Sequence, residues 1–146
     1  MTEVDKAYIA GFFDGEGHVC IVLNGLPEIW QTRITVGITQ NNREVLEWIQ
    51  GIYGGSLYKR RGQYTNVCGT HERFTNDLLI RKSENIIKFL LDILPYLRIK
   101  TEQAFLALEF CSLLHFGKSS EENRKKRIEL RNKLLVLNSK DKPVSS

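Results

Sequence analysis

Cysteine is scarce in this sequence: Cys20, Cys68 and Cys111 are odd in number and widely spaced. No two of them form a paired-cysteine motif, which argues against a disulfide framework or a zinc site and favours a reducing, intracellular compartment. Cys68 and His71 are close enough in sequence to act as two metal ligands, but no second pair follows them.

Long apolar stretches are also missing. No run approaches the roughly 20 residues that a membrane-spanning helix needs. The first five residues, Met-Thr-Glu-Val-Asp, have neither the basic start nor the apolar core of a signal peptide. We therefore expect an intracellular protein that has no membrane partner.

Composition and length indicate one globular domain. The chain has 146 residues, of which 42% are hydrophobic and 26% are charged, so a single core can form. We expect this domain to cover residues 1–138 and residues 139–146 to form a flexible tail. The net charge of +4 and the pI near 9.0 permit nucleic-acid binding without proving it.

Residues 7–17 carry the most informative pattern. Ala7, Gly11 and Gly15 recur at every fourth position, so on a helix they share one face and allow another backbone to come close. Gly15 and Gly17 predict the end of this helix, because glycine readily adopts the positive φ of a helix terminus.

Glu16 lies at the end of this predicted helix, where the negative end of the helix dipole disfavours a bare carboxylate. An ordinary buried helix ending in glycines would leave this residue unexplained. A divalent cation held by oxygen ligands would explain it, because it would neutralise the carboxylate.

The next segments alternate as strands do. Residues 18–23 have their apolar side chains at odd positions, and Asn24-Gly25, extended by Leu26-Pro27, predicts a hairpin turn. In the return strand, residues 29–40, one face is apolar and comprises Trp30, Ile34, Val36 and Ile38. The other face comprises Gln31, Arg33, Thr35, Gly37 and Thr39. It is either simply solvated or reads base edges in a major groove.

The rest of the chain continues the alternation of helices and strands. A helix beginning at Asn41–Arg43 should end at Gly54-Gly55, and residues 56–82 should form either two strands with a long turn or three short strands. Tyr58, Tyr64, Lys59, Arg60 and Arg61 mix basic and aromatic side chains there, as in a nucleic-acid contact or a plain soluble hairpin. Helices should follow, capped at Ser83, beginning at Thr101, and capped at Ser119 with Glu122.

Ile9-Ala10-Gly11-Phe12-Phe13-Asp14-Gly15-Glu16-Gly17 resembles the LAGLIDADG motif of homing endonucleases and their maturase relatives. The resemblance covers about residues 5–103. It implies an α+β fold with an αββαββα core, an antiparallel saddle-shaped sheet and additional C-terminal helices. Because the motif occurs once, it also implies a homodimer acting on a long, pseudo-palindromic DNA duplex.

The resemblance further implies a site. Glu16 and the Gly15 carbonyl would bind Mg²⁺, for which Mn²⁺ or Ca²⁺ can substitute. Gln40 would order water, and Lys100 would be the catalytic basic residue. The predicted dimer interface comprises Ala7, Gly11, Asp14 and Gly15, with Asp14 in a structural role. The predicted DNA-binding residues are Asn24, Gln31, Arg33, Thr35, Gly37, Tyr58, Arg60, Arg61, Arg73 and Arg98.

One position departs from the family. Many relatives have an arginine just inside the second helix, whereas this chain has Glu44 there, with Arg43 beside it. We therefore leave open which residue completes the basic pocket.

The predicted activity is site-specific cleavage of both DNA strands, leaving 3′ overhangs. Two alternatives remain: a host-intron RNA maturase or non-cleaving DNA-binding protein on the same fold, and a dimeric scaffold with no nucleic-acid role.

Overall fold

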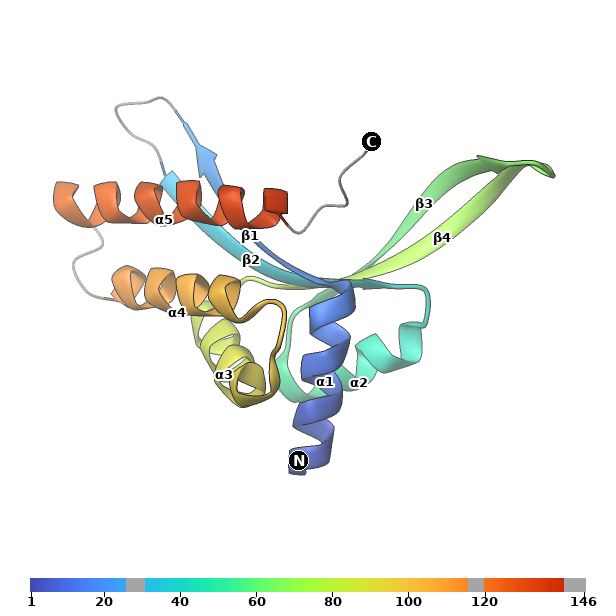
Figure 1. The fold of residues 1–146 in the computed structure, drawn as a ribbon, viewed down its shortest axis with the longest axis horizontal. Coiled ribbons are helices and arrows are strands. Elements are labelled where there is room, and N and C mark those ends of the chain that lie inside the picture. Colours follow the sequence, from blue (N-terminus) through green and yellow to red (C-terminus); the bar gives the residue numbers. More distant parts are fainter. Residues whose placement is uncertain (26–30, 116–119, 141–146) are drawn as a thin grey trace.

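The computed structural model describes residues 1–25, 31–115 and 120–140. Its elements confirm the predicted αββαββα order, followed by two further helices (Figure 1). They are α1 (Glu3–Glu16), β1 (Gly17–Asn24), β2 (Gln31–Gln40), α2 (Arg43–Tyr53), β3 (Ser56–Asn66), β4 (Gly69–Ile80), α3 (Ser83–Ile93), the 3₁₀ turn η2 (Leu94–Tyr96), α4 (Thr101–His115) and α5 (Glu121–Lys140).

The described strands form one antiparallel sheet in the order β1-β2-β4-β3. Each hairpin pairs along its whole length, but β2 and β4 pair only from Val36↔Ile80 to Gln40↔Asn76. Beyond this short central ladder the two hairpins diverge, which produces the curved, saddle-like sheet seen in Figure 1. Helix α1 stands under the middle of this sheet, with its C-terminal end directed at the strands.

One face of the sheet supports the core. Val19 and Ile21 of β1, Val36 and Ile38 of β2, and Leu78 of β4 are buried there against the helices. This burial follows the period-two pattern, because alternate strand residues point to the same face. Among the described residues, no helix covers the opposite face, which is called the open face below (Figure 1).

Helix α1 begins after Thr2, whose hydroxyl accepts a hydrogen bond from the Asp5 backbone N–H at 3.1 Å; the Asp5 carboxylate accepts one from the Thr2 N–H. The predicted reason for its end was wrong. Gly15 remains helical, and Gly17 has an extended φ of −90°. Gly17 is instead required by close packing, because a Cβ there would lie 2.1 Å from the ring of Phe13.

Glycine does end α2 as predicted, since Gly54 and Gly55 have φ values of +79° and +102°. Residues 56–80 form two long strands joined at Val67-Cys68, which confirms the two-strand alternative but shows that its long turn was wrong. The reason is that residues 69–72, which have no strong strand pattern of their own, pair with residues 63–66 of β3.

Two helix caps differ from the prediction. Lys82, which makes no side-chain cap hydrogen bond, occupies the N-cap of α3 in place of Ser83. In α5 the cap is Ser120, whose Oγ accepts a hydrogen bond from the Asn123 N–H at 3.0 Å. Helix α5 also includes residues 139 and 140, which were assigned to the tail. Leu26, Pro27, Trp30, Ser119 and residues 141–146 lie outside the described residues.

None of the helices within the described ranges is long and apolar enough to cross a membrane.

Candidate active site and nucleic-acid interface

Glu16 is the last residue of α1 and is exposed beneath the centre of the sheet. The next residue, Gly17, pairs with Ile38 of β2. Gly15, whose carbonyl is the second predicted metal ligand, is also exposed, and a Cβ on it would meet no atom within 4 Å. Both residues that would supply the metal ligands are therefore exposed at the junction of the two hairpins.

Asp14 fixes this end of α1 to the start of α4. Its buried carboxylate accepts hydrogen bonds from the backbone N–H groups of Arg98, Ile99 and Lys100 at 2.9, 3.2 and 3.0 Å. Asp14 therefore has a structural role within one chain, whereas its predicted place in the dimer interface stays a prediction. Carboxylates that accept several backbone hydrogen bonds in a buried setting rigidify the segments they join.

Lys100 lies beside the last turn of α1. Its Nζ donates a hydrogen bond of 2.7 Å to the carbonyl oxygen of Asp14. The ammonium group is therefore held at the negative end of the α1 dipole, close to the chain position of Glu16. This placement puts one positive charge beside the C-terminal end of α1.

Gln40 ends β2, and its side-chain oxygen accepts a hydrogen bond of 2.7 Å from the Asn41 N–H. Asn76 of β4 lies opposite it in the sheet. Arg43 reaches the same place, with Nη1 3.4 Å from Oδ1 of Asn76, while its Nε forms an ion pair of 2.9 Å with Glu47. Arg43, and not Glu44, therefore supplies positive charge near Gln40.

His18 was not predicted as a site residue, yet its ring lies over Gly37 at the centre of the open face. A Cβ at Gly37 would lie 2.5 Å from Cε1 of His18. Burial lowers the pKa of the imidazole; Asp77 acts in the opposite direction, while Arg60 and Lys100 add to the lowering. Strand alternation could have identified His18, because it places this residue on the face opposite the apolar Val19.

The open face carries most of the predicted DNA-binding residues. Register places Asn24 opposite Gln31 and Thr35 opposite Cys20, with Arg33 on the same face of β2. On the other hairpin Tyr58, Arg60 and Arg73 share this face by strand alternation. Tyr58 accepts a hydrogen bond of 3.2 Å from Arg81 Nη1, which lowers the pKa of its hydroxyl.

Three predicted DNA-binding residues are not available on this face: Arg98 lies outside the sheet, and two residues of the strands are also excluded. Gly37 is buried under His18, so any contact at that point would come from the imidazole. Arg61 points to the opposite side of β3 from Arg60, because neighbouring strand residues alternate. It forms an ion pair with Glu72 there, and its guanidinium lies 6.0 Å from the centre of the Phe74 ring.

Asp77 of β4 is a second residue that sequence reasoning missed. Its buried carboxylate accepts a hydrogen bond of 2.5 Å from Thr39 Oγ1 and pairs with Arg60, whose Nε lies 2.5 Å from Oδ2. Its signal in the sequence was a single acid within the otherwise apolar end of a strand. His18, Thr39, Arg60 and Asp77 form one polar cluster from all four strands.

Ala7, Gly11 and Gly15 are exposed in the single chain, and a Cβ on Gly11 would meet no atom within 4 Å. Val4 and Tyr8 extend this exposed stripe, with 77% and 56% of their surface accessible. The stripe borders a groove of about 600 Å³, which is lined by Ala7, Gly11, Asp14, Pro95, Tyr96, Leu97 and Arg98. Arg98, predicted to bind DNA, therefore lines this groove.

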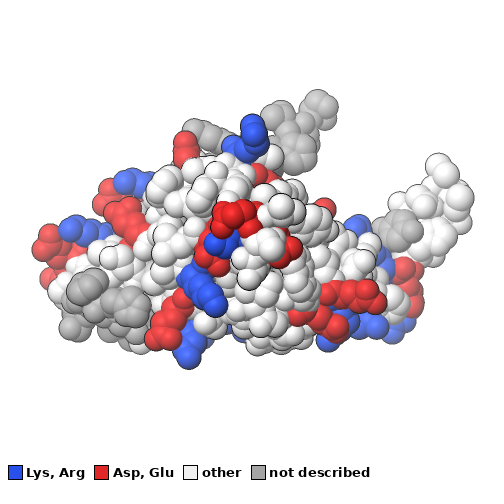
Figure 2. All heavy atoms as spheres, turned by 90° about the horizontal axis from the view of Figure 1, so that it is seen from below, with Lys and Arg blue, Asp and Glu red and all other residues white. Residues whose placement is uncertain are grey.

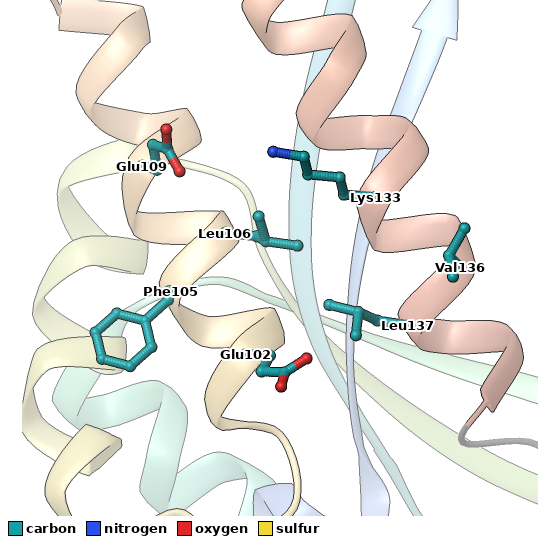
Figure 3. Close-up of a pocket in the computed structure, with 7 residues that line it drawn as sticks. All are labelled: Glu102, Phe105, Leu106, Glu109, Lys133, Val136 and Leu137. Carbon is teal, nitrogen blue, oxygen red and sulfur yellow. The ribbon is translucent and has the colours of Figure 1, made fainter.

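A second groove, of about 490 Å³, lies between α4 and α5, where Leu106 and Leu137 point toward one another (Figure 3). It contains none of the predicted site residues. Viewed from below, the helix side of the molecule shows acidic and basic side chains interspersed around uncharged surface (Figure 2). A surface of mixed sign has no strong attraction for a polyanion.

The donor set around Glu16 suits Mg²⁺ better than a metal that needs a full protein cage. Within the described residues, no three His, Cys, Asp or Glu side chains are grouped to hold a metal. Mg²⁺ commonly uses one or two carboxylates, with waters and substrate phosphates completing its shell. One exposed carboxylate and an adjacent carbonyl fit that requirement when a phosphate is present.

Residues 9–114 match a family model described as LAGLIDADG endonuclease. Comparison with curated proteins gives no match. Among solved structures, the homing endonuclease I-CvuI, in complex with its target in the presence of Ca, has a TM-score of 0.75 and 23% identity. The match covers 99% of this chain and 87% of I-CvuI.

The archaeal intron-encoded homing endonuclease I-Vdi141I, complexed with DNA, has a TM-score of 0.77 and 21% identity, with coverage of 99% and 90%. The LAGLIDADG homing endonuclease I-GzeII, in complex with a DNA target, has a TM-score of 0.67 and 20% identity. That match covers 86% of this chain but only 43% of I-GzeII. At these identities the likeness establishes the fold.

Proposed function

This chain belongs to the LAGLIDADG endonuclease family and is a DNA endonuclease, and from this premise we propose that it works as a homodimer. The dimer makes a metal-dependent double-strand break in a long, pseudo-palindromic duplex and leaves 3′ overhangs. The observation that carries the proposal is that one helix, α1, presents both an exposed small-residue stripe and the exposed carboxylate of Glu16.

The exposed stripe supports the homodimer. Glycine and alanine on one helix face allow a second helix to approach closely, and Val4 and Tyr8 would lose exposed apolar surface on pairing. Two-fold pairing of α1 would bring two copies of Glu16 together under the middle of a continuous pair of sheets. This chain matches less than half of I-GzeII, as expected if two copies replace one longer chain.

Each residue near Glu16 has a role that its surroundings allow. Glu16 and the Gly15 carbonyl would hold Mg²⁺, which supplies charge neutralisation and an activated water when bound. Lys100, anchored on the Asp14 carbonyl, would stabilise negative charge on the phosphate, and Gln40 would order water. Two structures of I-CvuI with DNA, one with 2 mM Ca and one with 2 mM Mg, support divalent-metal use in relatives.

Duplex DNA would lie across the open face of the sheet. A twisted antiparallel ribbon fits the major groove, and polar side chains on β1, β2, β3 and β4 face it. We place the protein inside the cell that hosts its target, in a reducing compartment.

The test uses a plasmid that contains the uninterrupted sequence at which the gene is inserted, with Mg²⁺. We expect two cuts, one per strand, mapped by end sequencing as 3′ overhangs. Glu16→Gln should bind this DNA and cut it at least about 100-fold more slowly, since the charge that holds the metal is lost. Glu109→Gln, an exposed change on α4, is the matched control and should cut normally.

Unchanged cleavage by Glu16→Gln would overturn the assignment of the site. A monomer on DNA in sedimentation would overturn the homodimer. Faster splicing of a host intron, with the DNA left intact, would instead identify a maturase.

A further inference from the structure

Asp77 is an unexpected residue on a face that is proposed to meet a polyanion. It lies in the middle of the sheet, opposite Thr39 of β2 on one side and Tyr58 of β3 on the other. A carboxylate here repels phosphate, so its presence needs an explanation beyond simple DNA attraction. That explanation rests on the proposed function.

Asp77 holds the guanidinium of Arg60 from one side. Arg60 Nε lies 2.5 Å from Oδ2 and Nη2 lies 3.1 Å from Oδ1, so both carboxylate oxygens are used. Thr39 Oγ1 donates to Oδ1 and fixes the carboxylate in turn. The side chain of Asp77 is 11% exposed, whereas that of Arg60 is 63% exposed.

The guanidinium is planar, with five N–H donors in a fixed fork. When Nε and Nη2 face Asp77, the other edge, formed by Nη1 and the second N–H of Nη2, points away from the carboxylate. That edge presents two parallel donors, which match the O6 and N7 acceptors of guanine in the major groove.

An ion pair whose arginine is mostly exposed to water contributes little to folding. It also cancels the charge of Arg60, which weakens any attraction to a distant phosphate. Arg33 and Arg73, on the same face, form no ion pair with any described residue and keep their full charge. The sheet thus separates charged arginines suited to phosphates from one arginine held in a fixed orientation.

We propose that Arg60 is a specificity-determining residue that reads one guanine in each half of the DNA target, and that Asp77 is its positioning residue. His18 and Thr39 complete the cluster around Asp77. Arg60 is therefore assigned to base recognition, and each half-site must contain a guanine opposite β3.

The test is selection from duplexes with randomised half-sites by the purified full-length protein, followed by sequencing of the bound fraction. The wild type should prefer guanine roughly 10-fold over the other bases at one position in each half-site. Arg60→Lys keeps the charge but loses the fork, so it should abolish this preference and leave the other positions unchanged. Because the side chain of Arg60 is mostly exposed, this substitution should not prevent folding.

Asp77→Asn tests the positioning role. It should weaken the guanine preference, yet bind random DNA more tightly at low salt and give a steeper salt dependence, because Arg60 regains its free charge. A merely structural residue would not change these two properties in opposite directions. Glu72→Gln is the matched control, since it removes the Arg61–Glu72 pair on the other face of the same hairpin. Its base profile should be that of the wild type.

Guanine preference retained in Arg60→Lys would overturn the inference. Equal weakening at all sequences would also overturn it, because that result identifies a phosphate contact. Cleavage of a defined target by the wild type would in either case leave the proposed function standing. If the wild type selects and cleaves no sequence, the proposed function itself fails.

Discussion

The two hairpins of the sheet have similar lengths but different support. The β1–β2 hairpin is backed by helices, with Val19, Ile21, Ile34, Val36 and Ile38 all buried. In the outer part of β3–β4, residues 58–74 are almost all exposed, and cross-strand pairs such as Thr65–Thr70 and Arg61–Glu72 lie on the surface. The β1–β2 hairpin is thus held by the hydrophobic core, and the outer part of β3–β4 is held mainly by the hydrogen bonds between its two strands.

This difference indicates how the two hairpins would meet DNA. A strand with a packed face keeps its open face in a fixed shape, which favours a preformed contact. A hairpin without such packing has few buried apolar contacts, so it opens locally at lower cost. We infer that β1–β2 provides the more rigid surface, while the part of β3–β4 beyond the Arg60–Asp77 pair opens locally at lower cost.

The largest expected effect is on the supported hairpin. Ile38→Ala removes a fully buried side chain from β2 and should lower the free energy of unfolding by about 4 kcal/mol, because it leaves a cavity. Urea unfolding at one fixed protein concentration measures this change. A loss below about 1 kcal/mol would contradict the claim that the core holds this hairpin.

A smaller effect involves Cys111 of α4, one of the helices behind β1–β2. Burial raises the pKa of its thiol from near 9 to about 11, against a hydrogen bond with Ser83 that lowers it. The thiol of Cys111 thus has a higher pKa in the folded chain than in the unfolded chain. Its contribution to the free energy of unfolding is therefore fully present below pH 9 and is lost as the pH rises toward 11. Relative to Cys111→Ala, the wild type should lose at most about 2 to 3 kcal/mol over that range.

The other cysteines serve as internal controls for this experiment. Cys20 on the open face of β1 and Cys68 at the end of the β3–β4 hairpin are exposed, so both should react with a thiol reagent at pH 8 while Cys111 does not. Bound duplex DNA should protect Cys20. Rapid labelling of Cys111 in the native protein would contradict its burial.

The smallest effect is expected in the outer hairpin. Phe74 is 45% exposed and lies under Lys59, whose Nζ is 4.9 Å from the ring centre. Phe74→Ala should therefore lower the free energy of unfolding by less than about 1 kcal/mol. Val67→Ala, at a fully exposed turn position, should change nothing and provides the baseline. A loss as large as that of Ile38→Ala would remove the distinction between the hairpins.

Much of the fold could be predicted because its signals are local. Alternation predicts β1 and β2, and glycine ends α2 at Gly54. The layout of β3 and β4 could not be predicted, since residues 69–72 become a strand only by pairing with β3. The face of Arg61 depended on that layout, because a strand assigns neighbouring residues to opposite sides.

The sequence by itself determined the family motif, the order of elements and the position of Glu16 at a helix end. Only the tertiary structure decided why Gly17 must lack a side chain, which backbone groups Asp14 binds, and which arginine Asp77 holds. The physical reason is how far apart in the sequence the interacting residues lie. Propensity and periodicity act between neighbours along the chain, whereas a close contact or a hydrogen bond between distant residues exists only after the strands and helices have packed.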